Sequence, residues 1–176
     1  MKLILAMILF IIGPAVSYAE DDYASLTRAV VDRLTLPSIE RLLEVMPKLA
    51  TLTSTYCVNP SVYNRRQVEG QYHSVMDAWQ VAQVFAFGPL VRKGRSSRIH
   101  FWPGRVDITS RYLRKVIREK PESITDPKKL GEKSVAIQSL AAYEQFIFAK
   151  KMVETFDPYT CRIAAAIAHF QVGLIK

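Results

Sequence analysis

The densest group of chemically versatile side chains lies between residues 92 and 105, where basic residues alternate with aromatic ones. The group comprises Arg92, Lys93, Arg95, Arg98, His100, Phe101, Trp102 and Arg105. Guanidinium groups beside aromatic rings can bind phosphates and stacked bases, an anionic polymer, a small ligand or an acidic protein partner. The structural alternative is that Phe101 and Trp102 fill the core while the arginines are solvated or pair with carboxylates.

A second candidate is the series Glu69, His73 and Asp77, which are spaced four residues apart. On a helix this spacing aligns them along one side, and imidazole and carboxylate groups are ligands for transition metals. Three such groups on one helix cannot enclose an ion by themselves. We therefore interpret them as a solvated flank.

Motifs of hydrolases and nucleotide-binding proteins are missing from the sequence. It contains neither His-Glu-x-x-His nor Gly-x-Ser-x-Gly, and it has no glycine-rich phosphate loop. The residues alone therefore assign no reaction to the chain.

The first 19 residues resemble an export signal. Lys2 precedes an apolar run that Gly13 and Pro14 end, and Ser17 and Ala19 are small residues at a suitable cleavage site. The run is too short to span a bilayer. Cleavage would leave 157 residues with a formal charge of +7, and we expect residues 20–176 to form one soluble domain. An exported chain seldom meets nucleic acid, so we expect no nucleic-acid partner and no membrane span after cleavage.

Cys57 and Cys161 are the only cysteines. Exported proteins fold in oxidising compartments, so a disulfide between them is expected; two separately buried thiols are the alternative. Neither residue has a second Cys or a His at the spacing of zinc ligands.

Apolar residues recur at helical spacing almost everywhere, and no segment shows sustained strand-like alternation. This pattern predicts an all-α fold, a helical bundle of about six helices. The expected helices cover residues 23–34, 37–58, 61–87, 106–118, 134–151 and 158–170, with a kink or break at Pro47 and a short turn over 127–131. Residues 87–105 are expected to be a long irregular loop, a kind of segment that often carries function.

Several segments together resemble imelysin-like proteins, whose first named member was an insulin-cleaving membrane protease and whose relatives are described as iron-regulated. The resemblance lies in Trp79, in Phe85-Ala-Phe-Gly-Pro89, in Arg98-Ile-His-Phe-Trp-Pro103, in residues 134–148 and in Cys161-Arg162. Family members have two similar helical-bundle halves, and this chain would supply mainly the first. The resemblance implies a protein of the periplasm or outer membrane that is associated with iron uptake.

The family motif Gly-x-His-x-x-Glu, whose His and Glu are the proposed metal ligands, aligns with Ser139, Ala141 and Glu144. Only the glutamate is retained, so a metal site would need a ligand from water or from a remote residue. We expect Glu144 to be buried and to pair with an arginine of residues 92–105, or to contact a metal or another ligand. Iron or another divalent metal is the cofactor that the resemblance implies.

These observations favour an exported, non-catalytic binding module linked to iron or metal acquisition. Two alternatives remain. One is a metal-dependent peptidase, which rests on the family resemblance alone. The other is an interaction protein that docks an acidic partner at the cell envelope through the basic residues of 92–105.

Overall fold

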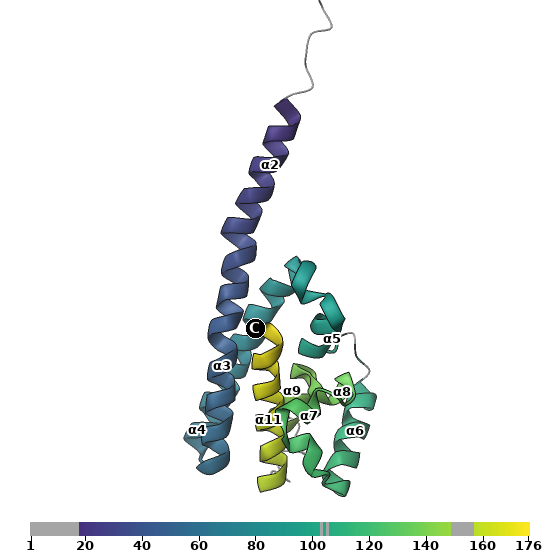
Figure 1. Ribbon diagram of the computed structural model, residues 1–176. Helices are drawn as coiled ribbons and strands as arrows, with labels where there is room; N and C mark the ends of the chain where they lie inside the picture. Colours follow the sequence, from purple (N-terminus) through teal and green to yellow (C-terminus); the bar gives the residue numbers. More distant parts are fainter. Residues whose placement is uncertain (1–17, 103, 105, 149–156) are drawn as a thin grey trace, which may run out of the picture. The chain divides into compact units, whose positions relative to one another are not determined.

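The computed structural model describes residues 18–102, 104, 106–148 and 157–176, and the regular structure in these ranges is helical (Figure 1). The all-α prediction is confirmed. The expected signal peptide lies almost wholly outside the described residues. Contacts divide the chain into two compact units, Met1–Pro37 and Ser38–Lys176, and the second contains the core described below. Within the described residues, no helix is both long enough and apolar enough to cross a membrane.

The first expected helix is α2, Tyr18–Val30, which a five-residue π-helix, η1, Val31–Thr35, extends. Helix α3, Leu36–Val58, follows and has Pro37 in its first turn, where a missing N–H costs nothing. Of the kink or break expected at Pro47, the break does not occur, because α3 continues through this residue. Met46 and Leu49 on either side are fully buried, and this packing outweighs the local cost of the proline.

Helix α4, Val62–Ala82, begins as predicted at Ser61, whose hydroxyl accepts a hydrogen bond from the Asn64 amide at 3.1 Å. The apolar stripe that the helical spacing predicts for this segment is buried at Val68, Tyr72, Val75, Trp79 and Ala82. Its last expected member, Ala86, lies beyond α4 and is partly buried. The helix ends about five residues earlier than expected. The short 3-10 helix η2, Gln83–Phe85, replaces its last turn.

Residues 88–99 form short helices instead of the expected irregular loop: η3, Gly88–Leu90, η4, Arg92–Gly94, and α5, Arg95–Ile99. Lys93 and Gly94 have φ of 54° and 66°, so the backbone turns through the left-handed region immediately before α5. Ile99 is fully buried and anchors α5 in the core.

Helix α6, Val106–Glu119, has the predicted inward residues Thr109, Leu113 and Val116 buried. The 3-10 helix η5, Glu122–Thr125, and the short α7, Pro127–Leu130, follow. The helix expected over 134–151 is divided into α8, Val135–Gln138, and α9, Leu140–Phe148, because Ser139 is extended, with ψ of 164°. Residues 149–151 lie outside the described part of the chain.

Helix α11, Pro158–Ile175, packs against α5, α7, α8, α9 and η5 and lies among them in Figure 1. Its predicted core residues Ile163, Ala164 and Ile167 are fully buried. A disulfide joins Cys161 to Cys57 at the end of α3, with the Cα atoms 5.6 Å apart. The predicted pairing is confirmed.

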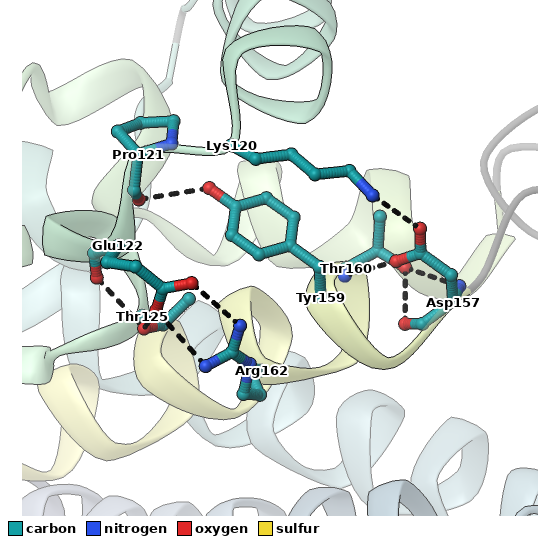
Figure 2. Close-up of polar contacts among 8 residues, drawn as sticks. All are labelled: Lys120, Pro121, Glu122, Thr125, Asp157, Tyr159, Thr160 and Arg162. Carbon is teal, nitrogen blue, oxygen red and sulfur yellow. Dashed lines mark hydrogen bonds and ion pairs between the residues drawn. The ribbon is translucent and has the colours of Figure 1, made fainter.

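The N-terminus of α11 is held by a capping box, as Figure 2 shows. The Asp157 carboxylate accepts from the Thr160 amide, and the Thr160 hydroxyl accepts from the Asp157 amide, both at 2.8 Å. Together these bonds satisfy two backbone donors that a helix start leaves open.

Tyr159 connects this helix start to the end of α6. Its hydroxyl donates to the Pro121 carbonyl at 3.0 Å, and Lys120 and Arg162 each lie 5.6 Å from its ring centre (Figure 2). Arg162 also donates two hydrogen bonds to the Glu122 carboxylate, at 3.0 and 3.1 Å. These contacts fix α11 relative to η5.

Candidate functional site

A cavity of about 370 Å³ lies where the end of α4, the segment after α5, α6 and α9 meet. The α4–η2 region contributes Gln80 and Gln83, and α6 contributes Thr109. The other described lining residues are His100, Phe101, Trp102, Gly104, Ala141, Glu144 and Gln145. The cavity falls within the size range of small-molecule sites, roughly 300–1,000 Å³.

Two of the three positions of the family motif face this cavity. Ala141 and Glu144 line it from α9, whereas Ser139 is fully buried and is not among its lining residues. Ser139 instead accepts a hydrogen bond from the Ala142 amide at 3.4 Å, at the start of α9. The motif serine is thus a helix-start residue in this chain.

The environment of Glu144 differs from the one expected. Its side chain is exposed rather than buried, and the ion pairs among described residues do not join it to Arg92, Arg95 or Arg98. Arg105 lies outside the described residues. Glu144 therefore presents its carboxylate to the cavity and to solvent.

His100 brings an imidazole into the same cavity from a different element. Its burial lowers its pKa, because a low-dielectric surrounding disfavours the charged form, and the nearby Glu144 carboxylate opposes this effect. The ring of Trp102 is nearly parallel to the His100 ring, at 7° with 6.3 Å between centroids. The prediction that Trp102 fills the core is wrong, since 73% of its surface is exposed.

A buried tyrosine lies beneath Glu144. The Tyr72 hydroxyl donates to the Leu140 carbonyl at 3.4 Å, and burial together with the Glu144 carboxylate raises the pKa of Tyr72. The Tyr72 ring stacks on that of Tyr143, whose hydroxyl lies 2.6 Å from the Thr53 hydroxyl. Tyr72 therefore stays protonated and connects α4 to the start of α9.

Arg98 holds the cavity wall in place without lining it. Its guanidinium donates to the Gln138 side-chain oxygen at 3.0 Å and to the Gly131 carbonyl at 2.9 Å, and it lies 5.0 Å from the centre of the Phe170 ring. Gln171 donates to the carbonyls of Arg98 and Gln138 at 2.8 and 2.7 Å. These bonds fix α5 to α8 and α11, and His100 follows α5 directly.

The basic residues of 92–105 thus have different roles. Arg92 and Lys93 are exposed, Arg95 is partly buried, and none of the three lines the cavity. Arg98 is partly buried and bonds to neutral oxygens, contrary to the expectation that it would be solvated or would pair with a carboxylate. Among the described residues of 92–105, those that line the cavity are His100, Phe101, Trp102 and Gly104.

The arrangement of the described His, Cys, Asp and Glu side chains gives limited support to the expected metal site. The described residues contain no group of three His, Cys, Asp or Glu side chains placed to hold an ion. Glu69 pairs with Arg65 at 2.7 Å, and His73 lies 5.4 Å from the Phe148 ring centre to centre. Both arrangements agree with the interpretation of that series as a helix flank.

No sequence motif points to Gln80, Gln83, Thr109, Gln145 or the neighbouring Tyr72 as site residues. Polar residues on exposed helix faces are common, so glutamines alone carry no signal. Gln145 could have been found by its position next to Glu144 on an otherwise apolar helix. The remaining residues meet only through tertiary packing.

Residues 35–175 match the imelysin family, peptidase M75. An imelysin-like protein from Psychrobacter arcticum 273-4 has a similar crystal structure, with a TM-score of 0.79 and 15% identity over 92% of this chain. The match covers 50% of that protein, so this chain spans about half its length. No curated protein matches. The family match extends over most of the described helices, and the chain belongs to the imelysin family.

Proposed function

We propose that this chain is an exported, non-catalytic binding module whose ligand occupies the cavity around His100 and Glu144. The observation that carries the proposal is the convergence of the retained motif glutamate with an imidazole and an exposed indole from a separate segment. Such a concave site with a few polar groups is typical of small-ligand binding.

The proposal excludes catalysis because the sequence lacks hydrolase motifs and has Ala141 at the histidine position of the family motif. Export to the periplasm is supported by the N-terminal sequence and by the disulfide, which suits an oxidising compartment. Native mass spectrometry of protein purified from a periplasmic fraction tests the proposal. A small-molecule adduct is expected in the wild type and not in Glu144→Ala, with Arg92→Ala as the matched control.

A role in iron or metal acquisition is the specific form that the family resemblance implies. His100 and Glu144 are the described cavity residues with suitable donor groups, so a bound ion would keep water or a chelator as further ligands. Calorimetric titration with ferrous, ferric and zinc ions tests this. Absence of micromolar binding, or unchanged binding in Glu144→Ala and His100→Ala, would remove the metal role.

A second candidate function is docking of an acidic partner, supported by the exposure of Arg92 and Lys93 next to each other. Rim charges of this kind act mainly on encounter rates and salt dependence. A partner captured through them should be released between low and high salt, and equal recovery at both would argue against this role.

A further inference from the structure

We propose that the cavity binds a neutral sugar ring, which stacks on Trp102, donates a hydrogen bond to the Glu144 carboxylate and exchanges hydrogen bonds with the neighbouring glutamines. This inference rests on the proposed function, because it names the ligand class of the same site.

The first argument is the exposed indole. A tryptophan gains stability from burial, yet Trp102 is 73% exposed at the cavity while Trp79 is 2% exposed in the core. The His100 ring supports Trp102 in a nearly parallel orientation. The result is a flat apolar surface with a polar edge, which matches the flat C–H face of a pyranose ring.

The second argument is the chemistry of the polar lining. Gln80, Gln83 and Gln145 each have both donor and acceptor groups, as the hydroxyls of a sugar do. The Gln83 NH₂ donates to the Gln80 side-chain oxygen at 2.5 Å, which leaves the Gln80 NH₂ as a donor and the Gln83 oxygen as an acceptor for a ligand. The Gln145 side-chain oxygen accepts from the Ser110 hydroxyl at 3.2 Å, which leaves its amide NH₂ as a donor for a ligand. Glu144 adds an acceptor for hydroxyl groups.

The third argument compares other ligand classes. An anion would meet the Glu144 carboxylate, and Arg98 points its guanidinium toward Gln138 and Gly131 instead. An organic cation has donors but no acceptor for the glutamine NH₂ groups. A bare metal ion leaves most of about 370 Å³ unfilled. A neutral polyhydroxylated ring uses the aromatic face, the amides and the carboxylate together.

The lining also indicates that such a sugar is bound rather than cleaved. Glycoside hydrolysis generally uses a pair of carboxylates on either side of the bond. Glu144 is the one carboxylate among the described lining residues. We therefore expect the sugar to leave the site unchanged.

Saturation-transfer difference NMR with glucose, galactose, N-acetylglucosamine and their disaccharides tests the inference on the full chain. At least one sugar should show transfer centred on its ring C–H protons. Trp102→Ala and Glu144→Gln should weaken binding at least tenfold, whereas Ser97→Ala, an exposed position outside the cavity lining, should leave it unchanged. Circular dichroism checks that the variants remain folded, and the exposure of both side chains makes this the expected result.

Parallel titrations with zinc chloride and choline chloride distinguish a failure of the sugar inference from a failure of the proposed binding function. Absence of transfer to every sugar, or transfer that persists in Trp102→Ala, overturns the sugar inference. If zinc or choline then binds in a Glu144-dependent manner, the binding-module function stands with another ligand class. If no probe binds and native mass spectrometry shows no adduct, both fail.

Discussion

Arg98 shows how a residue outside a cavity determines the cavity's geometry. Its guanidinium bonds to Gln138 and Gly131 and contacts the Phe170 ring, and its own carbonyl accepts from Gln171. His100 and Trp102 follow within four residues. The position of the aromatic wall therefore depends on a partly buried polar network.

Arg98→Ala should lower the free energy of unfolding by about 2–3 kcal/mol, because it removes two charge-assisted bonds and leaves the Gln138 oxygen without its donor. Arg98→Lys should lower the free energy of unfolding by roughly half that amount, since an ammonium group cannot reproduce the planar arrangement of donors in the guanidinium. Urea denaturation measures both. Arg92→Ala, an exposed control, should stay within about 0.5 kcal/mol of wild type; an equal loss there would contradict the assigned role.

Gly104 is required by a close backbone approach. A Cβ at this position would lie 2.4 Å from the Phe101 carbonyl oxygen and 2.6 Å from the Phe101 ring. Gly104→Ala should therefore cost about 1–3 kcal/mol and shift Trp102 fluorescence, because the 101–104 turn must open. Gly70→Ala has no atom within 4 Å of the new Cβ and should stabilise α4 by about 0.5–1 kcal/mol. Thermal unfolding followed by tryptophan emission measures both variants.

At the residue scale the sequence predicted part of the site. Composition identified His100 and Trp102 within 92–105, and the resemblance identified Glu144. It did not predict that Trp102 would be exposed or that Arg98 would be internal, because both depend on which side α5 presents to α8 and α11. The amino-acid composition of residues 92–105 is the same whichever side of α5 faces α8 and α11, so composition could not predict the orientation.

At the scale of elements, apolar spacing predicted the principal helices, since each buries a stripe that recurs every three to four residues. The errors are local. The extended backbone of Ser139 divides α8 from α9, although its neighbours all favour helix. Pro47 remains inside α3 because the residues around it are buried. Tertiary packing overrides local preference in both cases.

The capping box of α11 gives a prediction at this scale. The Thr160 amide bond lowers the pKa of Asp157, so its stabilising effect is present above about pH 4 and is lost as the pH falls through the folded-state value. Asp157→Ala should cost about 0.5–2 kcal/mol at pH 7. Asp157→Asn keeps a capping oxygen but cannot titrate.

Denaturation of both variants across pH 2.5–7 checks this. The stability difference between wild type and Asp157→Asn should shrink below about pH 4, where the carboxyl becomes protonated. A difference that is constant with pH would show that the charge of Asp157 has no part in the cap.

For the whole molecule, the Cys57–Cys161 disulfide joins residues 104 positions apart. Closing a ring of about this size restricts the unfolded chain, and the entropy model gives about 4.7 kcal/mol. The double variant Cys57→Ser/Cys161→Ser should be about 2–5 kcal/mol less stable in urea. Reductant should destabilise the wild type similarly and leave the double variant unchanged; equal stability of the two proteins would contradict the prediction.

The overall class of the molecule could be predicted because helical spacing, the paired cysteines and the family segments all point to one all-α architecture. Similarity to about half of a larger imelysin-like structure agrees with the expectation of a single bundle half. The cavity could not be predicted in the same way. It is built from the α4–η2 region, residues 100–102 and 104, α6 and α9, and their side chains meet only after the helices have packed.

The described residues that line the cavity, from Gln80 to Gln145, all lie between the two bridged cysteines. The site is therefore contained within one covalent ring. A single protease cut in the exposed 91–94 segment would open this ring without releasing a fragment. The nicked protein would keep its full mass on a non-reducing gel and would separate into two pieces only after reduction, and every residue of the site would remain attached to the same molecule.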